Sequence, residues 1–263
     1  MGKAIGVFSL KGGVGKTSVV VSLGDALASF GKKVLLVDGN LSAPNLGIHL
    51  NLIEPEVTLH DVLAREKNLR EAIYNVGNLD VIPGTIFSKK AVNPLTLRNK
   101  INFLKKKYDI ILIDSPPSLN EEGLATIFAS DEMIVVATPD HPTISSTIKA
   151  IKRAKQRGVK IKGIVLNKVY KKNFELDVED IEKVLGVPIM ATIPHDIDVA
   201  KALSNFVPST SYKPRSEGST EFKKLAAVLI GKKHKPFRFK DIFKLTPNKS
   251  QINREIFYER AFK

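Results

Sequence analysis

The sequence contains no cysteine among its 263 residues. This absence excludes disulfide bonds, thiolate zinc sites, cysteine-ligated iron–sulfur clusters and cysteine nucleophiles. Histidine gives no substitute, because its five occurrences are scattered, without an i, i+4 pair or carboxylates at ligand spacing. These residues are His49, His60, His141, His195 and His234. The composition therefore turns attention to chemistry performed by lysine, aspartate and backbone groups.

Long apolar runs are also lacking. No stretch approaches the roughly 18 apolar residues that cross a bilayer. The chain begins with an apolar, strand-like hexamer at 3–8, where a secretory leader would place a charged segment before an apolar one. We therefore expect a cytoplasmic protein.

Positive charge is in excess and unevenly distributed. Lys and Arg number 41 against 27 Asp and Glu, a formal net charge of +14, which favours contact with nucleic acid, anionic lipid or an acidic partner. Residues 232–263 hold ten Lys and Arg against three Asp and Glu, so they carry +7 of that total. We place a boundary there and expect one domain over 1–231 followed by a basic tail over 232–263.

Short apolar runs alternate with segments of helical spacing along the first 231 residues. The runs predict strands at 4–8, 34–37, 79–82, 110–113, 133–137, 161–166 and 188–193, and the helical spacing covers 16–30, 94–106, 143–157 and 178–185. Apolar runs without alternation are typical of parallel strands buried on both faces. The pattern predicts an α/β fold, a doubly wound and mostly parallel sheet with helices on both faces, with its ligand site at the carboxyl ends of the strands.

A glycine-rich loop at 11–17 follows the first predicted strand and opens the first predicted helix. It reads Lys-Gly-Gly-Val-Gly-Lys-Thr, with Ser9 and Leu10 near the place where a phosphate loop usually has its first glycine. Such a loop turns backbone N–H groups onto phosphate oxygens, while a lysine neutralises the β- and γ-phosphates and a hydroxyl ligates Mg²⁺. The expected ligands of ATP are Gly12, Gly13, Val14, Gly15, Lys16, Thr17 and Ser18.

The lysine that opens this loop resembles the signature of the deviant Walker A motif in the MinD/ParA family. The resemblance covers roughly residues 3–230 and implies a P-loop NTPase fold. It also implies that Lys11 reaches the phosphates bound by a second copy of the chain, so that ATP bridges a face-to-face homodimer. The alternative is that Lys11 is a solvated lysine of the loop with no specific role.

The segment after the second predicted strand is similar to switch I of that family, which usually reads V-D-x-D followed by N-L. Here the sequence is Val-Asp-Gly-Asn over 37–40, with Asn-Leu at 45–46. The resemblance places Asp38 near Mg²⁺ and Asn40 at the position that orients the attacking water. A neutral amide orients water but takes up no proton, so Asn40 predicts slow hydrolysis.

Two further segments resemble family motifs. The buried run at 110–113 ends in Asp114, followed by Ser-Pro-Pro, as in switch II, and this carboxylate is expected to hold Mg²⁺ through water. Asn167 at a strand end and Pro194 in an Ile-Pro-His-Asp turn resemble the segments that pass beside adenine. Both could equally be ordinary turns at strand ends.

Composition excludes two related classes and argues against a third. The nitrogenase iron protein and the iron–sulfur scaffold ATPases need cysteine, and the tyrosine kinases of this fold need a tyrosine cluster, whereas the tail has only Tyr258. The MinD type, which cycles on a membrane or polar scaffold, and the ParA type, which binds DNA, remain. In the tail Phe239, Ile242 and Phe243 share one helical face among basic residues. Three roles of the tail therefore remain open: it packs on the core, it binds an anionic membrane, or it binds DNA or another acidic partner.

The combined interpretation is a MinD-like ATPase that binds ATP and Mg²⁺, dimerises and acts as a spatial switch in cell division or polar positioning. Lys11, Lys16 and Asn40 are its expected catalytic residues, and Thr17, Asp38 and Asp114 its expected metal ligands. A regulatory protein partner and a peripheral location at the membrane are also expected. The alternatives are an ATP-dependent recruitment module with negligible turnover and a ParA-like partition ATPase that binds DNA.

Overall fold

The computed structural model describes residues 2–88, 90–170 and 172–232, and within them one sheet of eight strands has the order β3-β4-β2-β5-β1-β6-β7-β8. The strands are β1 (Lys3–Phe8), β2 (Val34–Asp38), β3 (Tyr74–Val76), β4 (Leu79–Ile82), β5 (Ile110–Asp114), β6 (Glu132–Ala137), β7 (Ile161–Val169) and β8 (Ile189–Pro194). Among these strands only β3, at the edge of the sheet beside β4, runs antiparallel to its neighbour. The predicted α/β fold with a mostly parallel sheet is confirmed.

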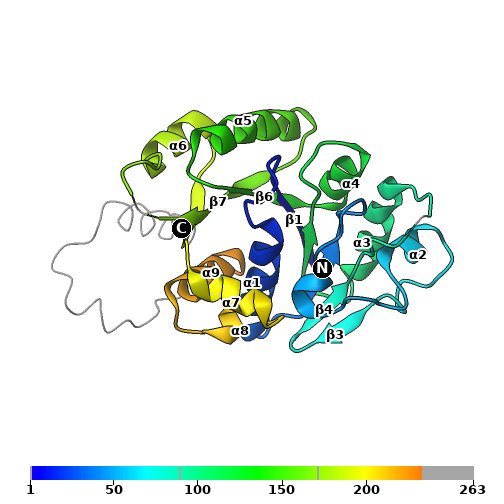
Figure 1. The fold of residues 1–263 in the computed structure, drawn as a ribbon. Coiled ribbons are helices and arrows are strands. Elements are labelled where there is room, and N and C mark those ends of the chain that lie inside the picture. Colours follow the sequence, from blue (N-terminus) through cyan, green and yellow to red (C-terminus); the bar gives the residue numbers. More distant parts are fainter. Residues whose placement is uncertain (1, 89, 171, 233–263) are drawn as a thin grey trace.

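Helices cover both faces of this sheet (Figure 1). The face with α1 (Lys16–Ser29) also carries α7 (Ile197–Ser204), α8 (Ser209–Tyr212) and α9 (Glu217–Leu229). The other face carries α2 (Leu59–Leu63), α3 (Leu97–Leu104), α4 (Glu121–Ala129), α5 (His141–Gln156) and α6 (Val178–Leu185). Short 3₁₀ turns lie at η1 (Ile48–Leu50) and η2 (Pro94–Thr96).

Burial on both faces explains why the strands lack alternation. Along β2, Val34 and Leu36 join the core under α1 and α9, whereas Leu35 and Val37 join the core under α2 and α3. Successive side chains of a strand point to opposite faces, so a strand covered on both sides is apolar throughout. This is the pattern from which the strands were predicted.

The central strands bring the loop and two acidic residues to one edge of the sheet. β1 lies between β5 and β6, and β5 in turn pairs with β2. Because these pairs are parallel, the loop that leaves β1 and the aspartates that end β2 and β5 emerge at the same edge. In the register of the sheet Asp38 is paired directly with Asp114.

Some elements differ from the prediction. The helix expected over 94–106 begins as η2, becomes regular at Leu97 and ends at Leu104. The expected tail over 232–263 lies outside the described residues except for Lys232, so its helix and its contacts remain predictions. Within the described ranges, no helix has both the length and the apolar character that crossing a membrane would require.

Candidate nucleotide site

The glycine loop between β1 and α1 has a backbone that other residues would strain. Gly13 and Gly15 have φ angles of 76° and 88°, in the left-handed region that favours glycine. At Gly15 a Cβ atom would also lie 2.5 Å from Asn167 Nδ2. The loop then enters α1 at Lys16, so the N-terminal end of a 14-residue helix, with its unpaired N–H groups, faces the loop.

Lys16 and the strand-end aspartates form a buried charged group behind the loop. Lys16 is 9% exposed, Asp114 is 2% exposed and Asp38 is fully buried. Burial lowers the pKa of Lys16, and the charges of Asp114 and Asp38 oppose that shift. Burial raises the pKa of Asp38, and the neighbouring Asp114 raises it further. The pKa of Asp114 is raised by burial, against the opposing effects of Lys16 and the Thr17 hydroxyl.

These residues fit a hard divalent cation. The Thr17 hydroxyl donates to Asp114 Oδ2 at 2.5 Å, so a hydroxyl and a carboxylate already lie together. Asp114 Oδ1 is buried and has no hydrogen-bond partner among the described residues. Oxygen atoms are the ligands that Mg²⁺ prefers, and two buried carboxylates at one point are costly without a cation to offset their charge. The assignment of Thr17, Asp38 and Asp114 as metal ligands stays a prediction.

The segment after β2 is held around Asp38. Its carboxylate accepts the backbone N–H of Leu46 at 2.9 Å and that of Asn40 at 3.2 Å. The Asn40 side chain is held by a neighbouring residue, because its Nδ2 donates to the Ala43 carbonyl at 2.5 Å. Asn40 is 9% exposed, so the predicted water-orienting amide is engaged within its own segment.

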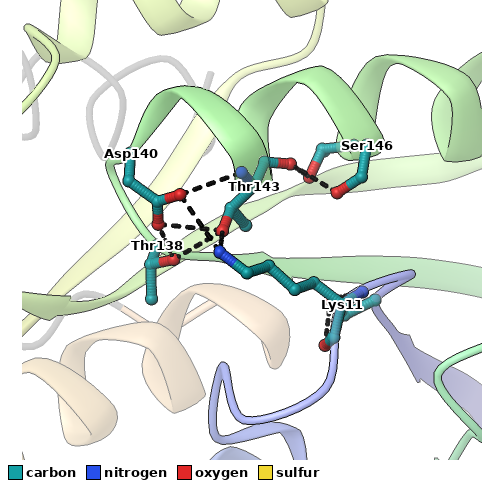
Figure 2. A network of polar contacts seen from close by, with 7 residues as sticks. Lys11, Thr138, Asp140, Thr143 and Ser146 are labelled. Carbon is teal, nitrogen blue, oxygen red and sulfur yellow. Dashed lines mark hydrogen bonds and ion pairs between the residues drawn. The ribbon is translucent and has the colours of Figure 1, made fainter.

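The side chain of Lys11 is directed toward the start of α5 (Figure 2). Its Nζ donates to Thr143 Oγ1 at 2.9 Å and to Asp140 Oδ1 at 3.2 Å. Asp140 caps α5 by accepting the Thr143 backbone N–H at 2.9 Å, and the Thr138 hydroxyl also donates to its carboxylate. We call Lys11, Thr138, Asp140 and Thr143 the Lys11 network. Burial opposes ionisation of Asp140, but the hydrogen bonds from Thr138, Thr143 and Lys11 outweigh it and hold its pKa at about 2.

Sequence reasoning missed Thr138, Asp140 and Thr143. A local signal was present, since Asp140 follows the end of a predicted strand and precedes a helix with proline in its first turn, which is typical of an N-cap. That signal predicts a helix start and says nothing about Lys11. The pairing arises because β6 lies beside β1, so the segments that leave both strands meet at one edge.

Asn167, one of the two residues expected near adenine, lies beside the loop. The Asn167 side chain is buried and donates to the Val14 carbonyl at 2.7 Å, while Lys168, in a left-handed conformation, donates to the Gly13 carbonyl at 2.7 Å. Both hold the loop backbone from the β7 side. Pro194 ends β8, and the ring of His195 after it stacks on Tyr170 with centroids 4.4 Å apart. Ser18, in the first turn of α1, is half-buried.

A glycine loop joining a central parallel strand to a helix, with two buried strand-end aspartates beside it, defines a P-loop nucleoside triphosphatase. A family model described as an AAA domain matches residues 2–162, and one described as 4Fe-4S iron sulfur cluster binding proteins of the NifH/frxC family matches residues 88–247. The chain belongs to the MinD/ParA family of P-loop ATPases. The absence of cysteine excludes the thiolate-held cluster named in the second description.

Individual relatives agree with this assignment. An uncharacterized ATP-binding protein of Methanocaldococcus jannaschii is 35% identical over 89% of this chain and 90% of its own length. The septum site-determining protein MinD of Thermotoga maritima is 31% identical over 88% of this chain and 89% of its own length. The structure of MinD from Pyrococcus horikoshii OT3, complexed with Mg-ADP, superimposes with a TM-score of 0.81 at 35% identity and covers 87% of this chain and 96% of that one.

Proposed function

We propose that this chain is a MinD-like ATPase that binds MgATP, dimerises around it and serves as a slow, nucleotide-dependent spatial switch. The observation that carries the proposal is the position of Lys11, which lies in the phosphate loop yet is paired with Asp140 instead of the buried acidic group. Its side chain is 44% exposed, so it is free to leave that pair for a ligand of higher charge. A triphosphate presented by a second copy is such a ligand.

The remaining site residues each bind a different part of MgATP. The loop from Gly12 to Gly15 presents N–H groups to the phosphates, and Lys16 neutralises their charge from the buried side. Thr17, with Asp38 and Asp114 behind it, would hold Mg²⁺, which offsets the charge that develops on the transferred phosphoryl group. Ser18 follows Thr17 in the first turn of α1. Asn167 and Pro194 would border the base.

Asn40 supports slow turnover. Its amide is hydrogen-bonded to Ala43 and must leave that contact before it can orient a water. Once there it accepts no proton, so hydrolysis depends on positioning and electrostatic stabilisation alone. Long-lived ATP dimers suit a switch whose reset depends on a partner. The same residue supports the second candidate, an ATP-dependent recruitment module with negligible turnover.

The proposed partners follow from the charge distribution. We assign the domain to residues 1–231 and the basic tail to 232–263, with the tail the segment that would contact an anionic membrane surface. A regulatory protein is the expected stimulus for hydrolysis, and DNA is the less favoured partner. Loss of liposome binding after Phe239→Ala with Phe243→Ala would support insertion of the tail, whereas salt-sensitive, ATP-dependent binding to random duplex would favour the partition class.

The decisive experiment measures mass in solution and ATP turnover with Mg²⁺ and either ADP or ATP. Wild type is expected to be monomeric with ADP and dimeric with ATP. Lys11→Ala should bind ATP but stay monomeric, and Lys16→Ala should lose nucleotide binding. Lys152→Ala, which removes one exposed lysine from α5, is the matched control and should behave like wild type. A wild-type protein that remains monomeric with ATP would refute the dimer switch, and dimers without measurable turnover would favour the recruitment module.

A further inference from the structure

A second basic feature lies at the end of the sheet opposite the phosphate loop. An open pocket of about 790 Å³ is lined by Lys3, Lys32, Lys33, Lys105, Lys106 and Lys107. Lys3 starts β1, Lys33 precedes β2, and the lysine triplet comes before β5, so the pocket borders the amino ends of three adjacent strands. Over the six residues of β1, at about 3.3 Å per residue, this end lies roughly 17 Å from the loop end.

The lysines of this pocket are only partly neutralised by the protein. Lys105 pairs with Asp131 at 2.6 Å. Lys3 shares the single carboxylate of Glu132 with Lys160 and Lys162, at distances of 3.2 to 3.4 Å. Asp109 is the one acidic residue among the described residues that line the pocket, and its carboxylate accepts the Lys33 backbone N–H at 2.8 Å.

Four lysines of the pocket form no ion pair within the described ranges, namely Lys32, Lys33, Lys106 and Lys107. Lys33 and Lys107 instead place their Nζ atoms 5.5 Å from the centre of the Tyr108 ring. Gathering this many like charges around one concave surface is unfavourable. A bound anion would relieve that repulsion.

The shape and chemistry of the pocket favour a compact anion. Its volume lies within the roughly 300–1,000 Å³ of small-molecule sites. Among the described residues that line it, the cations are all lysine. The lysine ammonium acts as a point charge toward phosphate and lacks the planar fork with which arginine reads guanine. Tyr108 offers no ring for stacking on bases, because it is 2% exposed and its hydroxyl donates to Asp80 at 2.7 Å.

We infer that this pocket, which we call the lysine pocket, binds a compact ligand carrying two or more phosphate groups. The ligand is either a free polyphosphorylated molecule or the headgroup of an anionic lipid, since both present the same chemistry. The inference is independent of the dimer switch, because the pocket and the phosphate loop lie at opposite ends of the sheet. Lys232, two residues after Ile230 of the pocket lining, adds a further positive charge where the basic tail begins.

Inorganic tripolyphosphate is the probe, titrated into the full chain saturated with MgADP so that the phosphate loop is occupied. The test variant carries Lys32→Gln, Lys33→Gln, Lys106→Gln and Lys107→Gln. The matched control removes four exposed lysines elsewhere through Lys149→Gln, Lys152→Gln, Lys155→Gln and Lys172→Gln. The test variant should lose at least about tenfold in affinity at low salt, and the control less than twofold.

Two further arms separate the sources of phosphate. The second measurement is sedimentation of the protein with vesicles of phosphatidylcholine and cardiolipin. If the ligand is a headgroup, less of the test variant than of wild type should sediment with the vesicles. If the ligand is free in solution, the two should sediment equally. The basic tail is present in every variant, so its contribution to vesicle binding cancels. The arginine version of the test variant, with all four charges kept, should restore binding of tripolyphosphate.

Three results would overturn the inference. Equal losses in test and control variants would show a general effect of net charge. Unchanged affinity in the test variant, with its melting temperature and MgADP binding intact, would show that the pocket holds no phosphate. A test variant that loses binding to random 30-base-pair duplex but keeps binding to tripolyphosphate would make the surface a nucleic-acid contact.

Discussion

Lys11 and Asp140 lie 129 positions apart in the chain, yet Lys11 Nζ is 3.2 Å from Asp140 Oδ1 at the capped start of α5. The contact joins the loop after β1 to the segment after β6. It holds the lysine at one side of the loop, and the carboxylate that holds it also caps a helix. If the lysine has to cross to a second subunit, the Asp140 contact opposes that step.

Substituting Asp140 tests whether this contact restrains dimerisation. Asp140→Asn removes the charge that holds Lys11 but keeps an efficient N-cap for α5. Because the pair is half exposed it is worth at most about 1 kcal/mol in each subunit, and a symmetric dimer breaks two such pairs. ATP-dependent dimers should therefore form at up to about 30-fold lower protein concentration. Analytical ultracentrifugation across a concentration series measures this shift. Weaker dimerisation than in wild type would show that Asp140 supports the dimer instead.

Asn40→Asp should change hydrolysis and stability in opposite directions. A carboxylate at this position can accept a proton from the attacking water, so turnover should rise by about 10- to 100-fold, a part of the range for a positioned base. Without nucleotide the new carboxylate would face the Ala43 carbonyl that Asn40 now contacts, so the apo protein should be less stable by about 1 kcal/mol. Steady-state phosphate release and thermal melting give the two readouts. A variant with lower turnover and unchanged melting would contradict both expectations.

Gly15→Ala should abolish nucleotide binding. The substitution adds the strain of a left-handed φ, about 1–2 kcal/mol, and places a methyl group 2.5 Å from Asn167 Nδ2, which anchors the loop. Gly158→Ala is the matched control, because Gly158 has a φ of 73° and open space around its Cβ position. The control should be destabilised by a similar strain energy but should bind MgADP normally in calorimetry. Equal binding by both variants would mean that the contact with Asn167 does not shape the loop.

Asp61 should make the free energy of unfolding depend on pH below about pH 4. Burial opposes its ionisation, but contacts from Lys90 and Thr58 outweigh that effect and hold its pKa at about 2, below the usual value near 3.9. A depressed pKa means that the ionised form stabilises the fold above about pH 4, and that this contribution is lost as pH falls toward 2.

The corresponding measurement is urea unfolding of Asp61→Asn and wild type at several pH values. The side chain is 16% exposed, so the variant should be less stable by about 1–2 kcal/mol at pH 7, with the difference shrinking toward pH 2. Asp180→Asn is the control, because its pair with Lys183 is highly exposed and 3.9 Å long, and we expect no measurable change there. A difference that persists at pH 2 would assign the loss to the cap geometry instead of the charge.

Much of the fold could be predicted because strands buried on both faces are apolar throughout. The runs at 79–82 and 110–113 matched β4 and the apolar part of β5 for this reason. β3 was missed because three residues carry no periodicity, although Gly77 and Asn78 between β3 and β4 form a two-residue link typical of a hairpin. α4 was missed as well, although Asn120 followed by two glutamates is typical of a capped helix start.

The candidate site also has features that the local sequence predicts and features that it does not. Its loop and its strand-end aspartates are local patterns, so Lys16, Thr17 and Asp114 could be placed from the sequence. The contacts of Lys11 and Asn167 could not, because each depends on which strands are neighbours in the sheet. The order of β5, β1, β6 and β7 has no local signature, and it decides that Asp140 and Asn167 lie beside the loop.

The central place of β1 has a consequence for how the protein is made. β1 pairs with β5, whose first residue is Ile110, and with β6, which ends at Ala137. During synthesis at about 5–20 residues per second, the first strand waits several seconds or longer for either neighbour. Until then its apolar side chains are not covered, and its backbone and the phosphate loop have no sheet to support them. The nucleotide site is thus a late product of folding, although the residues of its loop are synthesised well before those of β5 and β6.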